Sequence, residues 1–224
     1  MDGIIAVNKP TGITSYDVIR FIKRSFKLKD KIGHSGTLDP LASGVLIICI
    51  GKATRMSELF MNTDKEYEAK LLLGVKTDTD DIKGKVLETR EVKVKEEDIL
   101  QVIKGFEGTI EQVPPVVSAI KQNGTPLYKL HRKGVIVSPE PRTIEVKRIE
   151  VIDISFPYVD FRVECSKGTY IRAICRDIGD KLGCGGTQAA LKRTRVGDFT
   201  IEHTATLEDL EQQGMERYLI SVKR

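Results

Sequence analysis

The first third of the chain alternates short apolar runs with turn signals, a pattern typical of short strands and helices. The apolar run Ile4–Val7 ends at a Lys-Pro-Thr-Gly turn, which predicts a strand. Thr14 followed by Asp17 is a capping-box variant, and the apolar positions after it predict a helix that ends near Phe26. The continuous β-branched run Val45–Ile50 predicts a strand buried on both faces.

The middle of the chain continues this pattern with more charge. Apolar residues within 56–60 predict a short helix, and the alternation of apolar and polar residues over 67–73 predicts a strand with one buried face. The charged stretch 78–98 predicts a loop, a strand pair and the start of a helix whose apolar side continues to Phe106.

Two long strands and a helix follow toward the C-terminus. Strands are predicted over 142–154 and 158–165, on either side of a turn at Phe156-Pro157, as in a hairpin. A helix predicted over 170–182 ends at Gly183, a residue type common just past a helix end. A short helical tail is predicted from about residue 205, over 207–222. Strands outnumber helices, which favours an α+β fold with a mixed, largely antiparallel central sheet flanked by helices and loops.

Composition narrows the class of protein. A chain of 224 residues with 40% hydrophobic residues suits one large domain, or one domain with an appendage. The 36 basic and 32 acidic residues give a net charge of +4, which permits a polyanionic partner without requiring one. No apolar run is long enough to span a membrane or to act as a signal peptide, so we expect a cytosolic protein.

The cysteines and histidines do not favour a metal site. The four cysteines contain no C-x-x-C pair, and the three histidines are far apart in sequence, so we expect buried thiols and no metal or disulfide framework. These residues are Cys49, Cys165, Cys175, Cys184, His34, His131 and His203.

Basic residues gather in three stretches, 20–31, 129–134 and 191–195. Such clusters are compatible with solvated helix faces and with contacts to a polyanion. The candidate recognition residues are Lys23, Arg24, Lys27, Lys129, Arg132, Lys133, Lys192 and Arg193.

One carboxylate has an unusual setting. Asp39 lies in GHSGTLDPLASGVL (33–46), among small residues and directly before a buried strand. An Asp-Pro step commonly starts a turn, so Asp39 is compatible with a structural Asx-turn. The small residues around it would also let a large ligand approach, and there the carboxylate could act as a nucleophile or general base.

A second candidate region is CSKGTYIR (165–172), at the start of the predicted helix. Backbone N–H groups at a helix start favour anions, and Lys167, Tyr170 and Arg172 lie there. Arg172 could pair with a buried carboxylate or a phosphate, or form an ordinary surface ion pair. Tyr67 and Tyr170 could each stack on a base or pack in the core.

Five segments together resemble the successive motifs of the TruB family of tRNA pseudouridine synthases, in the family's order. The resemblance runs from residue 3 to about residue 210, and the 33–46 loop and C-S-K-G-T-Y-I-R are its most specific parts. The segments are NKPTGITSYDVI (8–19), GHSGTLDPLASGVLIICIGKATR (33–55), DKEYEAKLLLGVKTDTDD (64–81), PPVVSAIKQNGTPLYKLHRKG (114–134) and CSKGTYIRAICRDIGDKLGCGGTQAALKRTRVGDF (165–199).

The resemblance implies the pseudouridine synthase fold and an activity. Family members isomerise the uridine at position 55 in the T-loop of tRNA by breaking its glycosidic bond, rotating the uracil and rejoining it through carbon 5, without a metal or organic cofactor. Asp39 occupies the position of the family's essential aspartate. It would attack or support the sugar's anomeric carbon, or attack the base, and the sequence leaves both open.

The other roles implied by the resemblance follow the motifs. Tyr67 would stack on the target base and move a proton, with Tyr170 and Leu191 lining the pocket. Arg172 would pair with Asp39, and His34 would hold the flipped nucleotides. Lys9 and Pro10 match a family motif that we interpret as structural.

The sequence departs from the family pattern in three places. Val117 replaces a usual aromatic residue, Ser35 replaces a common threonine, and the sequence ends at Arg224 without the PUA-type RNA-binding domain of many relatives. We therefore expect residues 1–224 to form a single catalytic domain that acts as a monomer on the T-arm of tRNA. Two alternatives are a non-catalytic tRNA-binding or folding protein of the same fold and a small-substrate glycosidase, which would need a second catalytic carboxylate.

Overall fold

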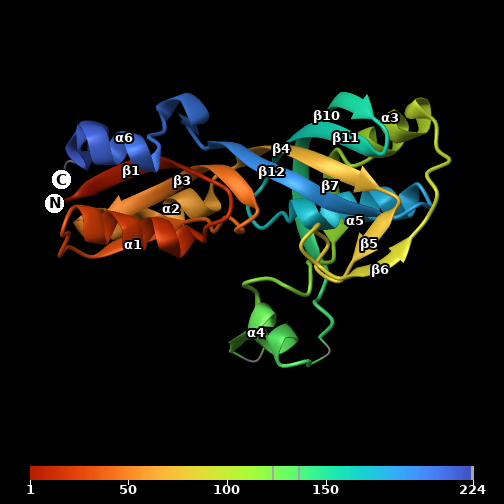
Figure 1. Ribbon diagram of the computed structural model, residues 1–224, viewed down its shortest axis with the longest axis horizontal. Helices are drawn as coiled ribbons and strands as arrows, with labels where there is room; N and C mark the ends of the chain where they lie inside the picture. The colour runs from red at the N-terminus through yellow and green to blue at the C-terminus, as the bar shows by residue number, and fades with distance from the viewer. Residues whose placement is uncertain (123, 136, 223–224) are drawn as a thin grey trace. The chain divides into compact units, whose positions relative to one another are not determined.

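The structure, a computed structural model, describes residues 1–122, 124–135 and 137–222 (Figure 1). It consists of two compact units. Unit 1 comprises Met1–Glu68 and Ala190–Arg224, and unit 2 comprises Ala69–Ala189. The chain passes from unit 1 to unit 2 within strand β4 (Lys65–Leu73) and returns within strand β12 (Gly186–Val196). Both terminal segments of the chain therefore build unit 1.

Unit 1 contains a mixed sheet in the order β14-β1-β3-β12. β1 (Gly3–Lys9) pairs antiparallel with β3 (Ala42–Ile50) and with β14 (Ile220–Ser221). β12 pairs parallel with β3, and this places Leu191 opposite Ala42 and Arg193 opposite Gly44. Two short strands, β2 (Ile32–Ser35) and β13 (Phe199–Thr200), pair antiparallel with β3 and β12.

The core of unit 1 lies on both faces of this sheet. Alternate side chains of a strand point to opposite faces. On one face, Ile4, Val45 and Ile47 pack in a cluster that also contains Phe60 and Val196. The alternate positions of β1 and β3 are fully or almost fully buried as well. This confirms the prediction that 45–50 is buried on both sides.

The helices of unit 1 follow the sequence signals in part. α1 (Ser15–Ser25) begins with the predicted capping box, because the Thr14 hydroxyl accepts from the Asp17 N–H and the Asp17 carboxylate accepts from the Thr14 N–H. A 3-10 turn, η1 (Gly51–Met56), precedes the predicted short helix α2 (Ser57–Asn62). The predicted helical tail is confirmed as α6 (Leu207–Gln213) and the 3-10 turn η3 (Met215–Tyr218), which follow a further 3-10 turn, η2 (Ile201–His203). It then ends as strand β14 on β1, so the prediction of a helix to residue 222 was wrong.

Unit 2 contains strands in the order β4-β11-β10-β7. The predicted hairpin is confirmed as β10 (Arg142–Ser155) and β11 (Tyr158–Cys165), and β10 pairs with β7 (Gly108–Gln112). β6 (Val86–Thr89) lies within the stretch 78–98 where a strand pair was predicted, but its partner β5 (Val75–Thr77) precedes that stretch, so the prediction is confirmed for one strand only. The helices are α3 (Glu96–Lys104), α4 (Leu127–Arg132) and α5 (Ile171–Lys181). Figure 1 shows α4, with β8 (Lys121–Gln122) and β9 (Thr125–Pro126), on a segment that extends from the rest of unit 2.

These elements confirm the predicted α+β class with a mixed, largely antiparallel sheet, because β1–β3, β10–β11 and β7–β10 pair antiparallel whereas β3–β12 pairs parallel. All four cysteines are buried, as expected. Among the described residues, none of the helices has the length and apolar character needed to cross a bilayer. The interpretation of residues 1–224 as one catalytic domain stays a prediction.

The close parallel pairing of β3 and β12 generates a stability prediction. Gly44 has φ +103°, and a Cβ there would lie 2.1 Å from the Arg193 carbonyl oxygen. We expect Gly44→Ala to cost at least about 1–3 kcal/mol more than Gly12→Ala. Gly12 is the matched control because its φ is +88° but a Cβ there meets nothing within 4 Å. Urea unfolding of both variants measures the difference, and equal losses would show that backbone strain alone accounts for the effect.

Candidate active site

The backbone on both sides of Asp39 is fixed by hydrogen bonds within unit 1. The Ser15 hydroxyl accepts from the Leu38 N–H at 2.9 Å and donates to the Leu38 carbonyl at 3.0 Å. The Gly12 N–H donates to the Pro40 carbonyl at 2.7 Å, and the Ala42 N–H donates to the Asp39 carbonyl at 3.0 Å. Asp39 itself is partly exposed. The site thus presents a carboxylate on a rigid backbone with access to solvent.

Lys9, at the end of β1, is fully buried near this loop. Its ammonium group donates to the carbonyls of Pro10 and Ile13, both at 2.8 Å, so it ties together the turn between β1 and α1. Burial lowers the pKa of Lys9 to about 8, while the negative charge of Asp39 acts to raise it and Arg193 to lower it further. These contacts are compatible with a structural role for the Lys-Pro motif. The negative charge of Asp39 also interacts with the Lys9 ammonium group.

Arg193 is also buried, with 1% of its surface exposed. Its guanidinium donates to backbone carbonyls of unit 1 rather than facing solvent. The expectation that Arg193 belongs to an exposed RNA-binding surface was therefore wrong. The error arose because the cluster 191–195 was interpreted as one stretch, whereas neighbouring residues of a strand point to opposite faces and Lys192 is exposed.

His34 lies on β2, which pairs with β3 beside the loop, and its backbone partner is Ile48. Its side chain is partly buried, and its Nδ1 has no hydrogen-bond partner among the described residues. Burial, and then the positive charge of Arg193, lower the pKa of His34. The neutral imidazole is therefore favoured, with one buried nitrogen that could accept or donate to a ligand.

Tyr67 lies on β4 and is 9% exposed. Two residues earlier, on the same buried face, the Lys65 ammonium donates to carbonyls at the end of α2, Phe60 at 3.0 Å and Met61 at 2.7 Å. Lys65 therefore fixes the start of the strand that carries Tyr67. Leu191 is partly exposed on β12 and pairs with Ala42. Ala42 follows Asp39 by three residues, so Leu191 lies near the Asp39 loop.

Arg172 lies in the first turn of α5 within unit 2, and 6% of its side chain is exposed. Its guanidinium donates to the carbonyls of Thr79 at 3.0 Å and Val117 at 2.9 Å, and it lies 3.8 Å from the Asp81 carboxylate. Val117 is the position where the family usually has an aromatic residue. Its carbonyl makes this contact, and a backbone group does not depend on the residue type. The pairing of Arg172 with Asp39 stays a prediction.

Tyr170 and Lys167 precede the same helix. The buried Gln112 side chain accepts from the Tyr170 N–H at 2.8 Å and donates to the Tyr170 carbonyl at 3.1 Å, which fixes the backbone at the start of α5. Tyr170 is partly exposed and Lys167 is exposed, so both side chains are accessible to a ligand.

Three features of the site were not identified from the sequence. Ser15, Arg193 and Asp81 each contact a predicted site residue or its loop, but all three are distant from it in sequence. One feature of the sequence could have indicated Ser15, because the hydroxyl of a serine in the first turn of a helix is available for hydrogen bonds to backbone groups. Ser35, which replaces a threonine, is buried and donates to the Ser57 carbonyl. In the described part of the chain, no group of three or more His, Cys, Asp or Glu residues is arranged to hold a metal ion.

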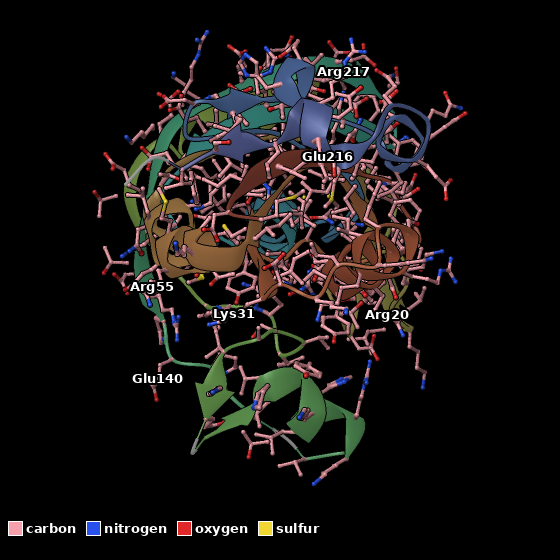
Figure 2. All side chains as sticks on the ribbon, turned by 90° about the vertical axis from the view of Figure 1, so that its left-hand side faces the viewer. Arg20, Lys31, Arg55, Glu140, Glu216 and Arg217 are labelled. Atoms are coloured by element: carbon pink, nitrogen blue, oxygen red, sulfur yellow. The ribbon has the colours of Figure 1, made fainter. Side chains whose placement is uncertain are left out.

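Three exposed basic residues of unit 1 lie along one edge. Figure 2 shows Arg20, Lys31 and Arg55 at that edge, opposite Glu216 and Arg217. Of the eight candidate recognition residues, seven are exposed and Arg193 is not. The exposed residues are Lys23, Arg24, Lys27, Lys129, Arg132, Lys133 and Lys192.

Comparison with known proteins identifies the class. Residues 23–171 match the N-terminal domain of the TruB family of pseudouridylate synthases, and residues 172–221 match the C-terminal domain of tRNA pseudouridylate synthase B. The chain belongs to the TruB family of pseudouridine synthases, which are isomerases.

Full-length similarity to curated proteins supports this assignment. The chain is 49% identical over 225 residues to tRNA pseudouridine synthase B of Clostridium tetani, covering 100% of this chain and 78% of that protein. It is 46% identical to tRNA pseudouridine synthase B of Syntrophus aciditrophicus, covering 99% of this chain and 71% of that protein.

Solved structures show the same fold. A chain of a Cbf5-Nop10-Gar1 complex matches with a TM-score of 0.74 and 37% identity, covering 96% of this chain and 57% of that chain. A chain of an H/ACA RNP bound to a substrate RNA containing 2′-deoxyuridine matches with a TM-score of 0.71 and 35% identity, covering 95% and 53%. This protein thus spans just over half the length of these two solved chains.

The buried Lys9 predicts a pH dependence of stability. Its folded-state pKa of about 8 lies below the ordinary 10.5, so between these values the unfolded chain binds a proton that the folded chain does not. The free energy of unfolding should therefore rise with pH in this window, by up to about 1.4 kcal/mol per pH unit. Below pH 8, Lys9 is charged in both states and contributes no slope.

Urea unfolding at pH 8, 9 and 10 tests this for the wild type, Lys9→Met and the exposed-lysine control Lys29→Met. The slope should fall in Lys9→Met relative to both other proteins. Identical slopes in all three proteins would contradict the assignment of a buried, weakly basic Lys9.

Proposed function

We propose that this protein isomerises uridine to pseudouridine at position 55 in the T-loop of tRNA. The observation that carries the proposal is the fixed backbone conformation around Asp39. Hydrogen bonds to Leu38, Asp39 and Pro40 hold the Asp-Pro step of the TruB loop motif in a fixed conformation, and Asp39 is partly exposed. The names of the relatives, tRNA pseudouridine synthase B, support tRNA as the substrate.

The reaction exchanges one bond for another. The bond between N1 of uracil and the sugar C1′ breaks, the uracil rotates, and a bond forms between C5 and C1′. C5 loses its proton and N1 gains one, so atoms and charge balance without oxidation or reduction. A carboxylate suits this chemistry, because it can stabilise or trap positive character at C1′ while the base is detached. We propose that Asp39 performs this step without a cofactor.

The remaining roles are assigned by position in the family motifs. Arg172 would pair with Asp39 and orient it. Its guanidinium is already fixed by the carbonyls of Thr79 and Val117, so it could hold a carboxylate with little loss of side-chain entropy. The Tyr67 ring would stack on the uracil, while its hydroxyl would move the proton. Tyr170 and Leu191 would line the pocket.

The target uridine must leave the stack of the T-loop before it can react. Base flipping costs a few kcal/mol and has to be compensated by stacking and phosphate contacts. His34, with its buried unpartnered Nδ1, would hold the flipped nucleotides. Lys167 and the seven exposed basic residues would contact phosphates, which position the RNA without reading its sequence. We propose that the T-arm is the main recognition element and that the protein acts as a monomer in the cytoplasm.

The first prediction concerns the catalytic group. Asp39→Asn keeps the shape of the side chain but removes the carboxylate, so tritium release from tRNA with 5-tritiated uridine should fall at least about 10³-fold, with tRNA affinity retained. Asp198→Asn, an exposed aspartate of unit 1, is the matched control and should retain full activity. Substantial turnover by Asp39→Asn would remove Asp39 from the chemistry. A wild type that binds tRNA but forms no pseudouridine would favour a non-catalytic RNA-binding protein.

The second prediction concerns Tyr67. Tyr67→Phe preserves the ring and its stacking but removes the hydroxyl, so the single-turnover rate should fall about 10²-fold or more, while tRNA affinity changes little. Tyr218→Phe, on η3, serves as the control for loss of a phenol. An unchanged single-turnover rate in Tyr67→Phe would leave Tyr67 with a stacking role alone.

A further inference from the structure

Arg193 makes an unusual set of contacts for a buried arginine. Its Nε donates to the Val45 carbonyl and its Nη2 to the Gly36 carbonyl, both at 2.8 Å. These two carbonyls lie on either side of Asp39 in the sequence, three residues before it and six residues after it. One planar guanidinium therefore links the beginning of the Asp39 loop to the strand that follows it.

The loop backbone also lies close to Arg193 at two glycines. A Cβ at Gly36 would lie 3.4 Å from Nη1 of Arg193, and a Cβ at Gly44 would overlap the Arg193 backbone. Both glycines have positive φ, of +72° and +103°. Arg193 therefore contacts both ends of the segment from Gly36 to Val45, and Asp39 lies between these contacts.

The charge of Arg193 reaches the groups around the loop. In the described part of the chain, Arg193 forms no ion pair with a carboxylate, and its hydrogen bonds go to neutral carbonyls. Burial lowers the pKa of both Lys9 and His34, and the positive charge of Arg193 lowers both further. Burying a cation costs free energy, and an apolar side chain of similar volume would avoid this cost but would leave the Val45 and Gly36 carbonyls without the Arg193 donors. Packing alone therefore gives no reason for an arginine here.

We propose that Arg193 is a positioning residue of the active site, which fixes the loop around Asp39 through the Gly36 and Val45 carbonyls and supplies a permanent positive charge beside His34. It acts through the loop and does not touch the substrate. The kinetic part of this inference rests on the proposed function, whereas the effect on His34 does not.

Two substitutions separate the positive charge of Arg193 from the fork of its guanidinium, the Nε and Nη2 donors that bind two carbonyls. Arg193→Met removes both. Arg193→Lys keeps the charge but replaces the fork with a single ammonium, which lacks the geometry to reach both carbonyls as the guanidinium does. Arg195→Met is the matched control, because Arg195 lies two residues further along β12 and donates to the Gly197 carbonyl, outside the Asp39 loop.

The first measurement is the NMR titration of the histidines, of which the chain has only three, His34, His131 and His203. The pKa of His34 should rise in Arg193→Met and should stay near the wild-type value in Arg193→Lys and Arg195→Met. An unchanged His34 titration in folded Arg193→Met would overturn the electrostatic part of the inference.

The second measurement is tRNA turnover by the folded variants, with folding checked by thermal unfolding. Loss of positioning should lower kcat about 10²-fold in Arg193→Met and about 10-fold in Arg193→Lys, with KM within about threefold of the wild type, because a displacement of about 1 Å at the reacting group has effects of this size. Arg195→Met should turn over as the wild type does.

The outcomes distinguish the inference from the function on which it depends. A wild-type protein that forms no pseudouridine would refute the proposed function and with it the kinetic part of the inference, while the His34 titration would still decide the electrostatic part. Wild-type kcat in folded Arg193→Met would overturn the positioning role with the function intact. If neither variant folds, Arg193 serves folding alone and the positioning role is refuted.

Discussion

The parallel pairing of β3 with β12 is the constraint on which the candidate active site depends. It places Arg193 opposite Gly44, and from there the guanidinium reaches the carbonyls of Val45 and Gly36. A side chain larger than hydrogen at Gly44 would overlap the backbone of Arg193. Arg193 can therefore bind the loop around Asp39 only if β3 and β12 approach closely at Gly44. The conformation of the loop thus depends on the pairing of these two strands.

This constraint joins parts of the chain that are far apart in sequence. The hydrogen bonds of Arg193 span 148 and 157 residues, and unit 1 is assembled from both terminal segments of the chain. Such contacts form only after a large loss of chain entropy, so they are costly to bring together and slow to form. The local anchors of the loop, from Ser15 and Gly12, bridge much shorter separations and can form with the first β-strand and helix. The Asp39 loop is thus ordered in part by local structure and completed by β12.

The elements were predictable from the sequence where one signal dominates locally. The capping box at Thr14, the alternation over 67–73 and the hairpin around residues 156–157 each use short-range rules, and each was confirmed. The end of the chain was not predictable in the same way, because Ile220 and Ser221 form a strand only by pairing with β1. Arg193 was misassigned for a related reason. A basic residue within a basic stretch suggests an exposed surface, and only the face of the strand to which it points decides its burial.

Two buried cations near one carboxylate loop are difficult to explain by stability alone. Burial lowers the pKa of Lys9, the charge of Asp39 partly offsets this effect, and repulsion from Arg193 lowers the pKa further. Each cation donates hydrogen bonds to backbone carbonyls. An apolar residue in its place would avoid burying a charge but would leave these carbonyls unpaired, which costs free energy of its own. Local violations of packing rules of this kind are expected at functional sites. Arg193 fixes the backbone of the Asp39 loop, and Lys9 fixes the neighbouring turn between β1 and α1. Under the proposed function, this pair of buried cations would hold the Asp39 carboxylate in place for chemistry at a sugar carbon.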